Sequence, residues 1–216
     1  SHELKTPITS IKGFVETLQD GGIEDAEQAK RFLSIIARQS NRLNAIIEDL
    51  LSLSRLEEDS EKRGISFELL GLKGVVKDVV EICSSKAEEK KVEISVDVDG
   101  DLKARINPAL MVQALVNLVN NAIKYSDEGS EVEVSVRGSG DEVEISVEDH
   151  GCGIARKHLN RLFERFYVVD KARSRKLGGT GLGLAIVKHI ARVHDGWVTV
   201  ESEPGEGSKF SIHLPA

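Results

Sequence analysis

The sequence has only two cysteines, Cys83 and Cys152, among its 216 residues. This number is too small for a disulfide framework and suits a reducing compartment. The sequence also lacks any apolar run long enough to span a bilayer, and its first residues do not form a signal peptide. We therefore expect a soluble segment. Because it begins at Ser1 without an initiator Met, we expect it to be the cytoplasmic portion of a longer, membrane-anchored receptor.

Clustered basic residues are also missing. The formal net charge is -7, which argues against a broad nucleic-acid-binding surface. The 40% of apolar and 30% of charged residues are typical of a soluble globular protein. The length suits one large domain, or a small element followed by a domain of about 150 residues.

The first quarter of the chain predicts an antiparallel helical hairpin. Its apolar residues recur at alternating spacings of three and four, as on one face of a helix, in two stripes that are interrupted at residues 20–22 by Asp-Gly-Gly. The stripes are Leu4, Ile8, Ile11, Val15 and Leu18, and then Ala29, Phe32, Ile36, Leu43, Ile46, Leu50 and Leu53, with the polar Gln39 at one position of the second stripe. Two helices alone bury too little apolar surface, so we expect a homodimer in which two hairpins form a four-helix bundle.

A change of pattern then predicts a second, mixed domain. The stretch 57–66 has no apolar period and indicates a linker, so we expect a hairpin at 1–58, a linker at 59–65 and a second domain at 66–216. In the second domain we expect helices at 72–87, 108–124 and 182–194. We expect strands at 92–98, 197–202 and 209–214, and a β-hairpin formed by two strands that start at 131 and 142. The fold class is therefore α+β, with an α/β sandwich after the hairpin.

Common phosphate-binding motifs are absent, because no GxxxxGK[ST] occurs and no GxGxxG is complete. Three other glycine-containing segments lie at 149–153, 178–183 and 205–208, where backbone N–H groups could approach a phosphate closely. Each is weak evidence alone, since glycine also marks ordinary turns. The helix at 108–124 adds Asn117 and Asn121 on one face, followed by Lys124 and Tyr125. Amide oxygens suit Mg²⁺ and a lysine suits phosphate.

Six motifs in one order make the whole chain resemble the two-component sensor histidine kinases. They are SHELKTP (H-box), NLVNNAIKYS (N-box), DHGCGI (G1), FERFY (F-box), GGTGLGLAI (G2) and GEGS (G3). Within that family, the long stretch from FERFY to VKHI looks most like the phosphate-sensing branch. The resemblance implies a kinase that binds ATP and Mg²⁺, phosphorylates its own histidine and passes the phosphoryl group to an aspartate of a response regulator.

The resemblance assigns the catalytic residues to the start of the chain. It implies that His2 is the phosphoacceptor and that Glu3 accepts or orients the proton on the other ring nitrogen. Histidine suits this role because it is largely neutral at cell pH and its phosphoramidate is easily passed on. In kinases with an ExxT pattern, the residue that matches Thr6 helps to remove phosphate from the partner. Pro7 cannot donate to the carbonyl of Glu3, so we expect a bend there.

The resemblance places the nucleotide in the second domain. It implies that Asn121 and Asn117 hold Mg²⁺ on the ATP phosphates, that Lys124 contacts phosphate, that Tyr125 lies near adenine and that Asp149 accepts a hydrogen bond from the adenine amino group. The remaining implied contacts are Gly151, Gly153, Arg165, Thr180, Gly181, Leu182, Gly183 and Ser208. A mobile lid over 168–180 would carry Lys171, Arg173, Arg175 and Lys176, although such cations are usually just solvated.

Some residues depart from the family pattern. His150 stands where Asn is usual, Cys152 replaces an aliphatic residue or proline, and Asp195 replaces a common glycine. One Cys and one His lack the remaining ligands of a zinc site, so we expect no metal there. His158, His189, His194 and His213 are expected to be surface or structural residues.

Two other functions fit parts of the sequence. One is an ATPase of the gyrase, mismatch-repair and heat-shock-chaperone kind, which shares this nucleotide fold but typically carries Glu at the position of Asn117 to activate water. The other is a dimerisation module that binds nucleotide only as a structural ligand. The hairpin with His2 and the intact Asn121 and Asp149 favour the kinase.

Overall fold

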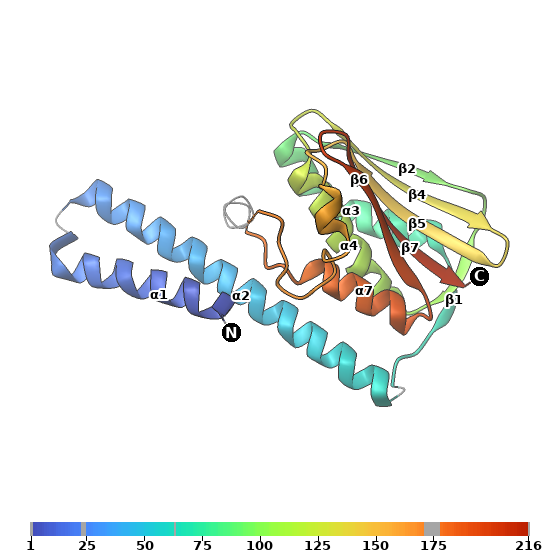
Figure 1. Ribbon diagram of the computed structural model, residues 1–216, viewed down its shortest axis with the longest axis horizontal. Coiled ribbons are helices and arrows are strands. Elements are labelled where there is room, and N and C mark those ends of the chain that lie inside the picture. Colours follow the sequence, from blue (N-terminus) through green and yellow to red (C-terminus); the bar gives the residue numbers. More distant parts are fainter. Residues whose placement is uncertain (1, 23–24, 63, 171–177, 216) are drawn as a thin grey trace.

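The protein consists of a long helical hairpin and an α/β domain. The computed structural model describes residues 2–22, 25–62, 64–170 and 178–215. Figure 1 shows the hairpin extending away from the domain, with the second helix of the hairpin running past the domain's helices. The fold class expected from the sequence is confirmed.

The hairpin is formed by α1 (His2–Thr17), the short π-helix η1 (Leu18–Gly22) and α2 (Ala26–Lys62). The turn comes where the sequence predicts it, since Gly21 has a positive φ of 107° that glycine adopts readily. The Asp25 carboxylate accepts hydrogen bonds from the amides of Glu27 and Gln28, which caps the start of α2. Phe14 and Phe32 pack against each other across the hairpin, with ring centroids 5.2 Å apart.

One face of the hairpin remains open in the single chain. Its exposed large apolar side chains are Ile8, Val15, Leu33, Ile47 and Leu51. The helix α2 also continues further than its apolar stripe, because the predicted linker is helical as far as Lys62 and the non-helical connection covers only 64–67. Glu, Lys and Arg are good helix formers, so a packed helix can extend through them without any apolar period.

The domain is built on a five-stranded sheet with the order β2-β4-β5-β7-β6. Its strands are β2 (Glu93–Val98), β4 (Glu131–Ser139), β5 (Glu142–Asp149), β6 (Trp197–Glu203) and β7 (Gly207–Pro215). Only the β2–β4 pair is parallel. A second sheet, which the sequence did not predict, pairs β1 (Glu68–Gly71) with β3 (Lys103–Ile106).

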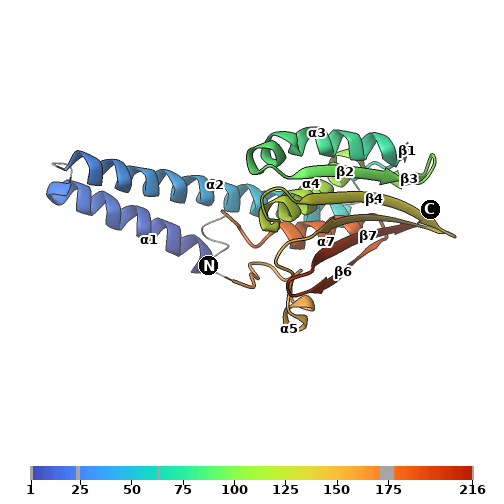
Figure 2. The same ribbon diagram turned by 90° about the horizontal axis from the view of Figure 1, so that it is seen from above.

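Three long helices cover one face of the large sheet, as Figure 2 shows. They are α3 (Leu72–Lys90), α4 (Pro108–Tyr125) and α7 (Gly183–Val193), and a short α5 (Arg156–Leu159) lies at the sheet's end. The start of α4 follows from local chemistry: Asn107 accepts a hydrogen bond from the Leu110 amide, and Pro108 occupies the first turn. These helices agree with the three predicted ones.

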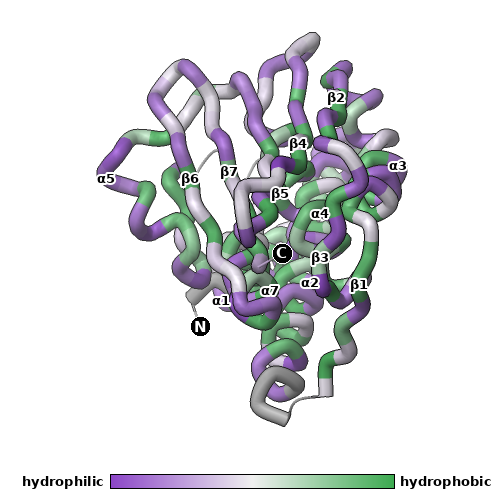
Figure 3. Tube along the Cα trace, turned by 90° about the vertical axis from the view of Figure 1, so that its right-hand side faces the viewer, coloured by the Kyte–Doolittle hydropathy of each residue, from purple (hydrophilic) through white to green (hydrophobic). Residues whose placement is uncertain are grey.

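The apolar core lies between the sheet and these helices, and Figure 3 shows apolar residues gathered there. Strands β4 and β5 send Val132, Val134, Val143 and Ile145 into it, at every second position. Leu53 and Leu56 of α2 are buried in the same core, so the end of the hairpin is docked on the domain. None of the helices in the described ranges combines the length and apolar character that a membrane span needs.

Candidate functional site

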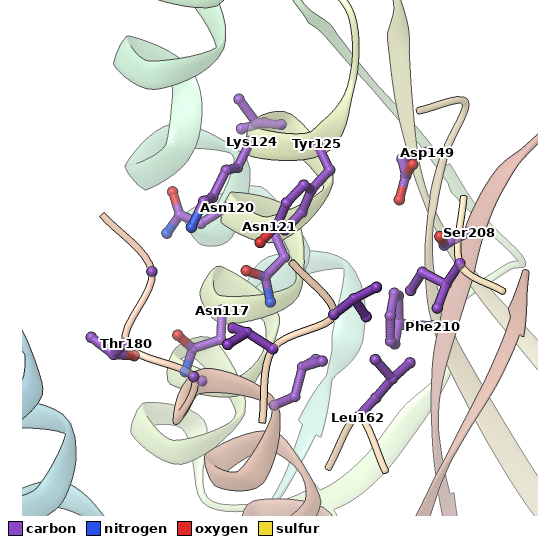
Figure 4. Close-up of a pocket in the computed structure, with 18 of the residues that line it drawn as sticks. Asn117, Asn120, Asn121, Lys124, Tyr125, Asp149, Leu162, Thr180, Ser208 and Phe210 are labelled. Carbon is purple, nitrogen blue, oxygen red and sulfur yellow. The ribbon is translucent and has the colours of Figure 1, made fainter. Parts of the chain in front are cut away.

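A cavity of about 540 Å³ opens between α4, the start of α7, the loop after β5 and helix α2. Figure 4 shows Asp149 and Thr180 on opposite sides of it, with Asn117 and Asn121 between them. It is lined by ten of the residues predicted to bind nucleotide: Asn117, Asn121, Lys124, Tyr125, Asp149, Gly153, Thr180, Gly181, Gly183 and Ser208. Gly151, Arg165 and Leu182, which were predicted with them, do not line it.

Asp149 provides a buried carboxylate at one end of the cavity. Its residue is only 5% exposed, and its Oδ1 accepts a hydrogen bond from the Gly151 amide at 2.9 Å. Burial raises the pKa of Asp149, while the bond from Gly151 and the charge of His150 oppose that shift. Leu162 and Phe210 line the cavity on the same side (Figure 4). An apolar slot with one buried acceptor can hold a flat ring that carries an amino group.

Asn117, Asn120 and Asn121 present their amides along the α4 side of the cavity. The Oδ1 of Asn117 would lie 3.2 Å from a Cβ added at Gly183, so α4 and the start of α7 approach closely there. The described residues contain no group of three His, Cys, Asp or Glu side chains able to hold a metal ion. Mg²⁺ commonly takes few protein ligands together with substrate phosphates, and the asparagine oxygens fit such a shared site.

Lys124 supplies a cation at the C-terminal end of α4. Burial, together with the positive charges of Arg42 and Lys90, lowers its pKa to about 8. Lys90 donates to the carbonyls of Ile123 and Lys124 at 2.7 and 2.6 Å, which fixes the end of the helix. The ammonium of Lys124 lies 5.3 Å from the centre of the Tyr125 ring. This concentration of positive charge can attract an anion such as a phosphate.

The glycines of the site are held in place by protein backbone. A Cβ at Gly151 would lie 2.4 Å from the carbonyl oxygen of Tyr125, and one at Gly153 would lie 1.8 Å from that of Glu203. Gly153 and Gly181 also have positive φ values of 62° and 76°. These positions therefore require glycine for the packing of the loops, whether or not a ligand is bound.

The sequence did not predict that α2 contributes to the cavity. Asp49 of α2 lines it and accepts a hydrogen bond from the Thr180 hydroxyl at 2.6 Å. Burial raises the pKa of Asp49, and the bond from Thr180 opposes the shift. Sequence spacing holds one clue, because Asp49 precedes the buried Leu53 and Leu56 by four and seven residues and so shares their face of the helix.

Two further polar contacts join α2 to the domain. The Gln113 amide donates to the Ser52 hydroxyl at 2.7 Å, and Arg165 forms an ion pair with Glu57. Arg165, for which the sequence predicted a phosphate contact, is thus engaged with the hairpin outside the cavity lining. Leu182 is fully buried beneath the site.

The predicted catalytic residues lie on the first two turns of α1. The side chains of His2 and Glu3 are outside the described residues, and Thr6 is exposed. His2 is twelve residues before Phe14, so in an antiparallel hairpin it lies opposite the residue about twelve after Phe32, near 44. That position is roughly 7.5 Å along α2 from Asp49. In both Figure 1 and Figure 2, the N-terminal end of α1 is the end of the hairpin that lies closer to the domain.

The other predicted features have these positions. Lys171, Arg173, Arg175 and Lys176 of the predicted lid lie outside the described residues. Cys152 is exposed and lines the cavity.

His194 is buried, with Nδ1 facing the Ile190 carbonyl at 2.7 Å and Nε2 accepting from the Asn107 amide at 3.0 Å. It is a structural residue, as expected.

Comparison with known families and proteins places both parts of the chain. The family described as "Histidine kinase-, DNA gyrase B-, and HSP90-like ATPase" matches residues 106–216, and the "His Kinase A (phospho-acceptor) domain" matches residues 1–59. The sensor-like histidine kinase SenX3 of Mycobacterium tuberculosis is 41% identical over 216 residues, which are 100% of this chain and 52% of SenX3. The sensor histidine kinase WalK of Bacillus subtilis is 37% identical over 219 residues, covering all of this chain and 35% of WalK. The chain therefore spans about half the length of SenX3 and about a third of the length of WalK.

Solved structures show the same arrangement. The histidine kinase AdeS of Acinetobacter baumannii is 26% identical, with a TM-score of 0.76 over 100% of this chain and 98% of that one. Full-length ShkA in complex with AMPPNP is 29% identical, with a TM-score of 0.70 over 99% of this chain and 44% of that one. The fold also matches histidine kinase ThkA in complex with response regulator protein TrrA, with a TM-score of 0.78 at 24% identity, covering 99% of this chain and 59% of that one.

The match to both domains, in the order of the six sequence motifs and with ten of the predicted nucleotide-binding residues around one cavity, leads to one conclusion: this chain belongs to the sensor histidine kinases.

Proposed function

We propose that the chain is a histidine kinase core that binds ATP with Mg²⁺, phosphorylates His2 and passes the phosphoryl group to an aspartate of a response regulator. The observation that carries this proposal is the cavity between Asp149 and the phosphoacceptor hairpin. Its volume of about 540 Å³ is ordinary for a nucleotide-sized ligand. ShkA, a relative in fold, was solved with an ATP analogue.

The geometry supports one orientation of ATP. The buried Asp149 carboxylate accepts a hydrogen bond from the adenine amino group, and Leu162 and Phe210 cover the ring. The phosphates then point toward Asn117 and Thr180 at the opposite side of the cavity (Figure 4). Asn117 and Asn121 would hold Mg²⁺ through their amide oxygens, and the ion would supply charge neutralisation on the phosphate oxygens.

In the reaction, a ring nitrogen of His2 attacks the γ-phosphorus of ATP. A nitrogen–phosphorus bond forms, the bond from the γ-phosphorus to the bridging oxygen breaks, and ADP leaves. Glu3 holds the proton on the other ring nitrogen, so the positive charge that develops on the imidazole is stabilised. Lys124 and the amides at the start of α7 stabilise the negative charge on the phosphate side.

Hydrolysis by the cavity itself is disfavoured by Asn117. The related ATPases carry a glutamate at this position to take a proton from water, and an amide cannot do so. Transfer to an incoming imidazole needs no base at that position. The kinase reaction is therefore the better match to these residues.

Two hairpins would form a homodimer through residues 1–58. Ile8, Leu33, Ile47 and Leu51 are exposed in the single chain, and a four-helix bundle would cover them. The link at 59–65, whose first four residues are the helical end of α2, joins the hairpin to the catalytic domain at 66–216. The whole chain is the cytoplasmic portion of a membrane-anchored receptor. The response regulator docks beside His2, where the exposed Thr6 orients water for the removal of phosphate from the partner.

The test is phosphorylation of the full-length protein with radiolabelled ATP and Mg²⁺. We expect label on the wild type that is lost in acid, as for a phosphoramidate, and none on His2→Gln. His213→Gln is the matched control, since His213 bonds Thr199 on the outer face of the sheet and should keep the label. Equal labelling of the wild type and His2→Gln, or no label on either, would overturn the assignment.

A further inference from the structure

A carboxylate of the hairpin lies inside the cavity that we assign to the nucleotide. Asp49 is half-buried among residues of the catalytic domain, and its Oδ2 is 2.6 Å from the Thr180 hydroxyl. Thr180 belongs to the glycine segment in front of α7, and α2 belongs to the phosphoacceptor hairpin. The two parts of the kinase therefore meet at the site itself.

Thr180 links Asp49 to the start of α7. Its hydroxyl donates to Asp49 and accepts a hydrogen bond from the Leu182 amide at 3.2 Å. Leu182 is the N-cap of α7, and the N-terminus of a helix attracts negative charge. The Asp49 carboxylate thus provides a negative group where an incoming phosphate would also be attracted.

The position along the cavity identifies which phosphate is affected. Asp149 and Thr180 lie on opposite sides (Figure 4), so an ATP whose adenine contacts Asp149 extends its phosphates toward Thr180. This step rests on the proposed function. The terminal phosphate reaches furthest and comes closest to Asp49, whereas the shorter ADP stops earlier.

Positive groups also line the cavity. Lys86 and Lys124 line the cavity, and Arg42, seven residues before Asp49 on α2, acts on Lys124 through its charge. Their positive charges attract the phosphates into the cavity, while the negative charge of Asp49 repels the terminal phosphate. The negative charge of Asp49 is therefore placed to discriminate between nucleotides by the number of phosphates.

We propose that Asp49 competes with the terminal phosphate of ATP for the Thr180 hydroxyl, so that ATP binding, more than ADP binding, displaces α2 from the catalytic domain. Further contacts of α2 with the domain lie on the same face of the helix as Asp49. They include Ser52 with Gln113, Glu57 with Arg165, and the buried Leu53 and Leu56. Loss of the Asp49–Thr180 bond removes the part of this face closest to the nucleotide.

The first experiment compares nucleotide affinities of the full-length protein, measured by displacement of a fluorescent ATP analogue in the presence of Mg²⁺. For Asp49→Asn we expect ATP to bind about five- to tenfold more tightly, as removal of one nearby like charge predicts, and ADP to change by less than about twofold. Glu48→Gln is the matched control. It removes the same charge from the neighbouring exposed residue outside the cavity lining. Its charge also acts on Asp49, but more weakly than burial does, so either affinity should change by less than about twofold.

Unchanged ATP affinity in Asp49→Asn, or an equal gain for ATP and ADP, would overturn the proposal while leaving the kinase assignment intact. If neither the wild type nor Asp49→Asn binds any nucleotide, both proposals fail. A comparable gain in Ser52→Ala, which loosens docking without changing charge, would show that docking alone and not the Asp49 charge controls affinity, and would also overturn the proposal.

The second experiment measures amide hydrogen exchange in α2 around residues 46–57. In the wild type, saturating ATP should increase exchange in this segment severalfold more than saturating ADP does. In Asp49→Asn the difference between the two nucleotides should disappear. Equal protection of the segment by both nucleotides in the wild type would contradict the displacement of α2.

Discussion

Replacement of Gly153 by alanine should destabilise the catalytic domain much more than its backbone conformation alone predicts. Gly153 has a φ of 62°, and an alanine in this left-handed region costs about 1–2 kcal/mol. An added Cβ would also lie only 1.8 Å from the carbonyl oxygen of Glu203, well inside the 3.0 Å that real contacts respect. The two loops would have to separate by about 1.2 Å, the difference between those distances.

That separation would strain two hydrogen bonds between the loops. Gly205 donates its amide to the Cys152 carbonyl at 2.9 Å, and Ile154 donates its amide to the Ser202 hydroxyl at 2.8 Å. Each such bond contributes about 1 kcal/mol. We therefore expect Gly153→Ala to lower the free energy of unfolding by about 3–4 kcal/mol in total.

Gly140→Ala is a matched control. Gly140 has the same φ of 62° in the β4–β5 turn, but no atom lies within 4 Å of its added Cβ. It should lose only the conformational part, about 1–2 kcal/mol. Urea unfolding followed by fluorescence of Trp197, the only tryptophan, reports on the sheet directly. Equal losses in the two variants would refute the reasoning that backbone contact, and not φ alone, requires glycine at 153.

Three further outcomes follow from the buried ionisable groups. Asp149→Asn should weaken ATP binding at least about tenfold in the displacement assay, because the amide offers a donor toward the adenine amino group, and it should not destabilise the fold, because burial already disfavours the charged carboxylate. The pKa of Lys124 is lowered to about 8, so ATP affinity should fall as the pH rises through 8, whereas Lys124→Arg, which stays charged, should bind ATP with little dependence on pH in that range. Burial lowers the pKa of His194 below 6.5, so the native state takes up its proton less readily than the unfolded state does. The free energy of unfolding should therefore fall as the pH drops below about 6.5, and His194→Gln should reduce that dependence in urea unfolding at several pH values.

Local patterns were enough to predict most of the fold. The helices at 72–87, 108–124 and 182–194 and the strands β4, β5 and β7 have apolar periods that match their burial, whereas Val96 of the edge strand β2 is exposed. The small sheet was missed because β1 and β3 have only four residues each, too short for a period to be distinguished from chance. The helical end of α2 was missed because residues 59–62 have charge but no apolar spacing.

The site was predictable where a motif carries it. Asn117, Asn121 and Asp149 were identified from the sequence and line one cavity. Asp49 was not identified, because its role depends on how α2 docks on the domain. Its partner Thr180 lies 131 residues later in the chain. Arg165 shows the same difficulty. It belongs to a motif and was expected to contact phosphate, but it forms an ion pair with Glu57 of the hairpin.

Because Leu53 and Leu56 are buried in the core of the α/β domain, the hairpin covers apolar surface of that domain. Whenever the second helix leaves, the apolar area that these leucines covered meets water, and that penalty grows with the area uncovered. Each displacement of α2 proposed above would therefore expose and then cover the same apolar patch, and the area of that patch would set the free-energy cost of the step.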